Sequence, residues 1–232
     1  MDLKYEIIGD PASRYWLIQI MDESDERDVS KEIECIHAGL EEIEVCFIRF
    51  TGVDWNLDLT PWMAPAVFKG ADFGSGAEET RLEMERILHR IAVLNRQHIV
   101  DKCLVIGGYS LAGLFTLWCA YNSTLFYGAV AASPSVWYPK WISYAKSNRC
   151  HCKRVYLSLG DKEKNTKNEI LSQVEDKIHR QLQLLKSDPN VHDSTLVMNP
   201  GNHFDKPWER TASGFVWALQ EQLILDEAMK RG

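Results

Sequence analysis

A serine flanked by small residues is the first place in this sequence where chemistry is expected. Ser110 follows the apolar run 104–106 and a pair of glycines, and apolar residues then recur at helical spacing from Leu111. A strand, a sharp turn and a helix with serine at the apex form a nucleophile elbow, whose strained turn needs small residues on both sides. Gly108 and Ala112 supply them. The usual pattern has glycine where this chain has Ala112, and alanine is the smallest departure from it.

A serine hydroxyl is a poor nucleophile at neutral pH, so it needs a general base and a carboxylate that orients the base. Among the seven histidines, His203 is the one that follows the carboxyl end of an expected strand, at 195–198. Asp161 and Glu163 follow another expected strand, at 154–160, and both are candidates for the carboxylate. The chain order of serine, acid and histidine is that of α/β-hydrolases. We therefore predict Ser110 as the nucleophile and His203 as the base.

The elements that must position these residues follow from the apolar pattern. Runs of β-branched and aromatic residues predict strands, and apolar residues at helical spacing predict helices between them. This alternation predicts an α/β fold with a mostly parallel, doubly wound sheet, helices on both faces, and the site at the carboxyl ends of the strands. A capping box at 75–78 predicts that one helix, of about five turns, begins at Ser75. The expected strands cover 3–8, 15–21, 45–50, 104–106, 127–132, 154–160 and 195–198, and the expected helices cover 29–40, 75–94, 111–121, 170–185 and a segment from about 205.

The segment 51–76 lacks periodicity and is far longer than an ordinary connection, which is typical of a functional loop. It carries more aromatic residues than a merely solvated loop would. Packing of the loop over the core and a substrate-lining role are both open. We predict that Trp55 and Trp62 approach the Ser110 pocket together with Tyr109 and Trp137, because apolar walls around a few polar groups are typical of small-ester sites.

Composition limits the class of partner. The chain has 232 residues, 45% of them hydrophobic, which is enough for one domain over 1–232. A net charge of −7 argues against a nucleic-acid partner and favours a neutral or cationic small molecule. The chain has no leader pattern and no apolar run of about 18 residues, so we expect a soluble, cytoplasmic protein with no membrane partner. A homodimer is left open.

We expect neither a metal nor a cofactor. The sequence Cys150-His151-Cys152 has no second pair at ligand spacing, so a connection before a strand is preferred to a metal site. Gly74 and Gly76 lack the third glycine of a dinucleotide fingerprint and do not directly follow a strand.

Four motifs together resemble a known family. They are 108–113, 133–138, 160–163 and 201–204, and the likeness covers nearly the whole chain from about residue 15. The sequence resembles esterases of the α/β-hydrolase fold, particularly the group similar to enterochelin esterases. The resemblance implies this fold without a large separate lid domain, and cleavage of carboxylic esters without metal or cofactor. In this family the acid commonly stands three residues after the glycine that ends its strand, which favours Glu163 over Asp161. A siderophore substrate is not carried over, because no basic cluster for a ferric catecholate is present.

The tetrahedral intermediate of ester cleavage requires backbone N–H donors aimed at its oxyanion. One is expected from Leu111, and the second from the turn after the strand residues 15–20, around Met21 or Asp22, by topology alone. The sequence therefore predicts a serine hydrolase that cleaves a small carboxylic ester through an acyl-enzyme. Two alternatives remain: an acyltransferase with the same residues, and a binding protein on a hydrolase fold that has lost turnover.

Overall fold

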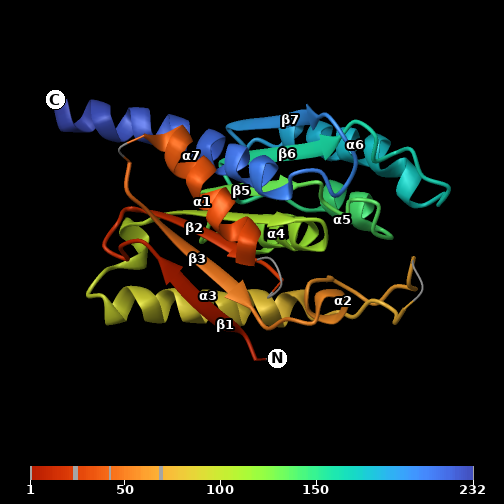
Figure 1. The fold of residues 1–232 in the computed structure, drawn as a ribbon, viewed down its shortest axis with the longest axis horizontal. Coiled ribbons are helices and arrows are strands. Elements are labelled where there is room, and N and C mark those ends of the chain that lie inside the picture. Colours follow the sequence, from red (N-terminus) through yellow and green to blue (C-terminus); the bar gives the residue numbers. More distant parts are fainter. Residues whose placement is uncertain (1, 23–25, 42, 68–69, 232) are drawn as a thin grey trace.

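The computed structural model describes residues 2–22, 26–41, 43–67 and 70–231. Over these residues the strands form one sheet in the order β1-β3-β2-β4-β5-β6-β7 (Figure 1). β1 is antiparallel to β3, and all the other neighbouring strands are parallel. The predicted α/β fold with a mostly parallel sheet is confirmed. The strands are β1 (Lys4–Ile8), β2 (Tyr15–Ile20), β3 (Val45–Thr51), β4 (Cys103–Tyr109), β5 (Gly128–Ala132), β6 (Arg154–Gly160) and β7 (Asp193–Asn199).

The central strands are buried on both faces. Every residue of β2, β5 and β6 is buried. A parallel sheet that helices cover on both sides needs apolar residues at successive positions, which explains why these strands read as continuous apolar runs rather than alternating ones. The edge strands differ, because Lys4 and Glu6 of β1 and Asp193 of β7 are exposed.

Helices cover the two faces of the sheet as separate layers. α1 (Glu26–Leu40) and α7 (Pro207–Arg231) pack with Leu17 of β2 on one face (Figure 1). α3 (Ala77–Leu94), α4 (Leu111–Asn122), α5 (Trp141–Ser147) and α6 (Val174–Ser187) pack with Trp16 and Ile18 on the other. Successive side chains of β2 therefore enter opposite layers, as the pleat of a strand requires. In the described part of the chain, no helix is long and apolar enough to cross a membrane.

The segment 51–76 is more ordered than its sequence predicts. It contains one turn of helix, α2 (Trp55–Asp58), which Asp54 caps by accepting hydrogen bonds from the N–H groups of Asn56 and Leu57. Ala64 and Phe73 then pair in an isolated antiparallel bridge, which folds the loop back on itself. α2 packs against α3 and against α4, the helix that follows β4.

The predicted capping box at Ser75 is wrong. α3 begins at Ala77, and its N-cap residue is Gly76, so no side chain at the N-cap accepts a hydrogen bond from the helix. The N–H of Gly76 instead donates to the carbonyl of Leu57, and a Cβ at Gly76 would lie 2.9 Å from that oxygen. Close packing of α2 on the start of α3 thus favours glycine at position 76. α5 was also not predicted, and two short 3₁₀ turns, η2 (Ile99–Asp101) and η3 (Leu171–Gln173), precede β4 and α6.

Candidate active site

Ser110 stands at the apex of a strained turn between β4 and α4. Its φ of 58° and ψ of −118° are unusual for a residue with a side chain. A Cβ at Gly108 would lie 2.4 Å from the carbonyl oxygen of Ala112, so glycine is required there. Ala112 is itself buried and fits the turn. Alanine in place of the usual glycine therefore preserves the elbow geometry.

Ser110, His203 and Glu163 lie in one hydrogen-bonded chain. The Oγ of Ser110 is 3.0 Å from Nε2 of His203, and Nδ1 of His203 is 2.7 Å from Oε2 of Glu163. An ionised carboxylate can only accept hydrogen bonds, so the proton of a neutral imidazole belongs on Nδ1. Nε2 is then left to accept the proton of the serine hydroxyl. The three residues come from the carboxyl ends of β4, β6 and β7.

Glu163 is held in its ionised form. Burial of the side chain opposes ionisation, but hydrogen bonds from His203, Ser133 and the N–H of Gly160 outweigh it and hold the pKa of Glu163 below its usual value. The close approach of the Glu163 carboxylate to the backbone at the end of β6 depends on Gly160, where an added Cβ would lie 2.9 Å from Oε1 of Glu163. Asp161 has a different task, because its Oδ1 accepts from the N–H of Gly201 in the loop that carries His203.

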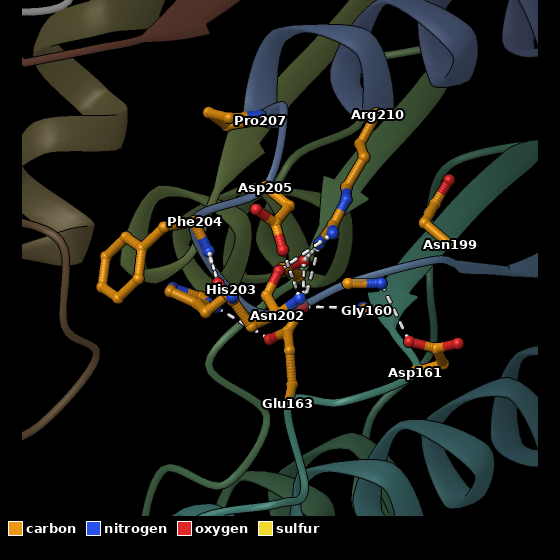
Figure 2. A network of polar contacts seen from close by, with 12 residues as sticks. Gly160, Asp161, Glu163, Asn199, Asn202, His203, Phe204, Asp205, Pro207 and Arg210 are labelled. Atoms are coloured by element: carbon orange, nitrogen blue, oxygen red, sulfur yellow. Dashed lines mark hydrogen bonds and ion pairs between the residues drawn. The ribbon is translucent and has the colours of Figure 1, made fainter.

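A buried arginine on α7 joins the parts of the site. Nη1 of Arg210 lies 3.0 Å from Oε1 of Glu163, and the two side chains are only 3% and 4% exposed. The same nitrogen donates to the hydroxyls of Ser133 and Tyr109, and Nη2 donates to the carbonyl of Asn202. Figure 2 shows Arg210 reaching from α7 to this cluster, whereas the ring of Phe204 points away from it. Charge-assisted bonds of this kind fix the geometry of the groups that they join.

Tyr109 fixes the backbone of the histidine loop. Its hydroxyl donates to the carbonyl of His203 over 2.6 Å. Burial raises the pKa of Tyr109 to about 12, so the phenol stays protonated and remains a donor at neutral pH. The loop is closed from its other side by Asp205, whose Oδ2 accepts from the N–H of Asn202. The position of the imidazole thus depends on contacts with β4 and with its own loop.

The two predicted oxyanion donors have different outcomes. The N–H of Leu111 is the first of α4 and donates to no acceptor among the described residues, so it is available to a ligand at Ser110. The N–H of Met21 is not available, because it donates to the carbonyl of Phe50 and extends the pairing of β2 with β3. Met21 is therefore wrong as a donor. Asp22, whose carbonyl accepts from Arg49, stays a prediction, and residues 23–25 lie outside the described part of the chain.

Three cavities of about 570, 420 and 190 Å³ meet at Ser110. Trp137 lines the largest and the smallest cavity, and Trp55 lines the smallest and the intermediate one. Tyr109 lines the intermediate cavity. Trp62 lines none of these three, so its predicted place is wrong. Its Nε1 donates to the carbonyl of Pro139, and its ring packs among aromatic rings of α4 and α5, which are Trp118, Trp141 and Tyr144.

Sequence reasoning missed three residues of the site. Ser133 lay inside a motif but was given no role, although it donates to Glu163. Phe204, 84% exposed, stands edge-on against the ring of His203 and lines two of the cavities. Arg210 gives no signal in the sequence, because an arginine in a helix is usually exposed.

No family model matches the chain, and no curated protein matches its sequence. Solved structures do match the chain in their fold. An IroE-like serine hydrolase from Shewanella oneidensis has a TM-score of 0.74 at 13% identity, over 92% of this chain and 74% of that one. The siderophore hydrolase EstA from Aspergillus nidulans has a TM-score of 0.66 at 15% identity, over 93% and 89% of the two chains. An enterochelin esterase from Shigella flexneri has a TM-score of 0.67 at 14% identity, over 95% of this chain and 55% of that one.

These similarities establish the fold that this chain shares with the three hydrolases. The resemblance to enterochelin esterase-like hydrolases, predicted from four motifs, is thereby confirmed at the level of the fold. At such low identity the chemistry has to be argued from the residues of the site.

Proposed function

We propose that this protein is a serine hydrolase of the α/β-hydrolase fold that cleaves small carboxylic esters through an acyl-enzyme. One observation carries the proposal: a serine in a strained elbow lies 3.0 Å from an imidazole nitrogen whose other nitrogen lies 2.7 Å from a buried carboxylate. This is the constellation that activates a hydroxyl for attack on a carbonyl.

The residues take the following roles. His203 accepts the proton of Ser110 at Nε2 while Oγ attacks the ester carbonyl. The oxyanion of the tetrahedral intermediate is stabilised by the N–H of Leu111 and by a second donor that we assign to the turn at Asp22. His203 then donates the proton to the departing alcohol, and a water molecule releases the acid by the same steps in reverse. Glu163 holds the proton on Nδ1 and stabilises the imidazolium.

The charges around Ser110 argue against a siderophore substrate like that named for two of the structural neighbours. Among the described residues that line the three cavities, Lys162 is the one lysine or arginine, and Asp28 and Glu32 are acidic. A ferric catecholate is a polyanion and would need clustered cations. We therefore propose a neutral or weakly charged ester.

Labelling with a fluorophosphonate probe tests the proposal, because an activated serine attacks the phosphorus, displaces fluoride and is phosphonylated. We expect labelling of the wild-type protein and of Ser147→Ala, whose hydroxyl is exposed on α5, and none of Ser110→Ala. Ester hydrolysis should follow the same pattern. A folded wild type that is not labelled contradicts the proposal and favours a binding protein. Labelling with transfer of the acyl group to an added alcohol, and little hydrolysis, favours an acyltransferase.

A further inference from the structure

The three cavities reach Ser110 from different sides of the catalytic histidine. His203 lines the cavities of about 570 and 420 Å³ and does not line the cavity of about 190 Å³. Leu111, which carries the oxyanion donor, lines the cavity of about 190 Å³ and neither of the larger ones. The small cavity therefore lies on the Leu111 side of Ser110 and does not include the imidazole in its lining.

Proton transfer fixes the orientation of an ester in such a site. The leaving oxygen must lie within hydrogen-bond reach of Nε2 of His203, since it takes its proton from there. The carbonyl oxygen must point at the N–H of Leu111. The remaining substituent of the reacting carbon is the acyl chain, which has to leave the site on the side away from His203.

We propose that the cavity of about 190 Å³ is the acyl subsite and that the two larger cavities receive the alcohol. The substrates are then esters of a small apolar carboxylic acid with a larger alcohol that carries both apolar surface and hydroxyl groups. This inference rests on the proposed function and adds the substrate class to it.

The walls of the small cavity match a small apolar acid. Phe73 and Trp137 are 4% and 7% exposed, and their rings contact each other at a centroid distance of 6.1 Å. Trp55 and Val67 add to the apolar lining, Asn56 and Ser135 are polar, and none of the described lining residues carries a charge. Because a cavity of about 150 Å³ holds benzene, this one fits a single aromatic ring or an aliphatic chain of similar size. Among the described lining residues, a charged acyl group would find no counter-charge.

Leu171, Val174 and Trp137 give the largest cavity an apolar wall, and polar groups line the rest of it. Lys162, Asn165, Thr166 and Asn202 line the largest cavity and offer hydrogen bonds to hydroxyl groups. Phe204 stands between the two larger cavities and provides an exposed ring against which an alcohol can pack. A bulky alcohol with hydroxyl groups is thus accommodated on the side of His203.

Two series of esters, measured as kcat/KM, test the assignment. The acyl series runs from acetate to decanoate and includes benzoate, all as p-nitrophenyl esters. The alcohol series consists of butyrates of methanol, glycerol and glucose. For the wild type we expect kcat/KM to decrease by roughly tenfold or more once the acyl chain outgrows the cavity, since one methylene in a pocket of fixed size discriminates that strongly. We expect the glycerol and glucose butyrates to be cleaved well.

Variants in the acyl subsite and in the alcohol cavity should affect the two ester series differently. Phe73→Ala enlarges the small cavity and should move the optimum to longer acyl chains, and Ala66→Leu, which adds bulk to the same cavity, should move it to shorter ones. Leu171→Ala is the matched control, because Leu171 lines the largest cavity and not the small one. It should change the alcohol series and leave the acyl optimum in place. Ala66→Leu keeps the test decisive if Phe73→Ala does not fold.

A wild type that is indifferent to acyl length overturns the assignment. So does a folded Ala66→Leu protein, checked by circular dichroism, whose acyl optimum is unchanged, or a Leu171→Ala variant that moves this optimum. Failure of the proposed function has a different signature, which is a wild type that cleaves no ester and is not labelled by the fluorophosphonate probe.

Discussion

Replacing Arg210 by methionine should destabilise the protein strongly, because it breaks a buried ion pair. The guanidinium lies 3.0 Å from Glu163, 2.9 Å from the Ser133 hydroxyl and 2.9 Å from the Asn202 carbonyl. Removing one partner of such a pair costs about 3–5 kcal/mol of unfolding free energy, since the other charge stays buried. Glu163 keeps its bonds from Ser133 and Gly160, so we expect a loss near the lower end, about 3 kcal/mol.

A double-mutant cycle isolates the pair. Glu163→Gln should also destabilise the protein, because it leaves the arginine buried without a counter-charge. The double variant Arg210→Met/Glu163→Gln leaves no buried charge at this pair, so it should be more stable than the sum of the two losses implies, by at least about 1 kcal/mol. Urea unfolding followed by tryptophan fluorescence measures all four proteins. Losses that add to within about 0.5 kcal/mol would refute the reasoning.

Arg210→Lys separates charge from geometry. The ammonium restores a positive charge, but it cannot reproduce the planar fork that meets Tyr109, Glu163 and Asn202 together. We expect it to recover part of the stability lost in Arg210→Met. Full recovery would mean that the charge alone matters.

Three further predictions concern the triad and the elbow. Glu163→Gln should lower kcat/KM by up to about four orders of magnitude, whereas Asp161→Asn should stay close to the wild type in the same esterase assay; the reverse pattern would exchange their roles. Gly108→Ala should abolish labelling by the fluorophosphonate probe, because its Cβ would lie 2.4 Å from the Ala112 carbonyl, and a folded variant that labels normally would contradict this. The pKa of Glu163 is lowered on folding, so the unfolded chain binds more protons in acid. The stability that ionised Glu163 contributes should be complete above about pH 4.3 and should be lost as the pH falls through the pKa of Glu163 in the folded protein. Urea midpoints measured across this pH range should therefore fall less for Glu163→Gln than for the wild type.

The strands and the order of the site residues could be predicted because they depend on local signals. A strand buried on both faces needs consecutive apolar residues, and β2, β4 and β6 have them. The carboxyl ends of parallel strands meet at one edge, so a residue just beyond a strand lies near the others of its kind. Ser110, Glu163 and His203 meet for this reason.

What failed depends on contacts that no local pattern encodes. The density of aromatic residues in 51–76 indicates burial but not which cluster a ring joins, and Trp62 joins the rings of α4 and α5. Met21 is lost as an oxyanion donor because the pairing of β2 with β3 continues for one residue more, through the hydrogen bond from the N–H of Met21 to the carbonyl of Phe50. The sequence does not show where this pairing stops. Arg210 meets Glu163 across 47 positions of the chain, and its neighbours in α7 give no hint of it.

The anchoring of the site to α7 also has a consequence for folding. Ser110 acquires its elbow from β4 and α4, which are neighbours in the chain, whereas the acid and the base are locked by Arg210 from a helix that follows all of these elements in the chain. The far end of this helix is tied to the start of β2, where Asp226 accepts from Tyr15 and Arg14. During synthesis the nucleophile can therefore reach its final geometry well before its partners do. Because Arg210 holds Glu163 and the Asn202 carbonyl, activity after dilution from denaturant should return no earlier than α7 docks.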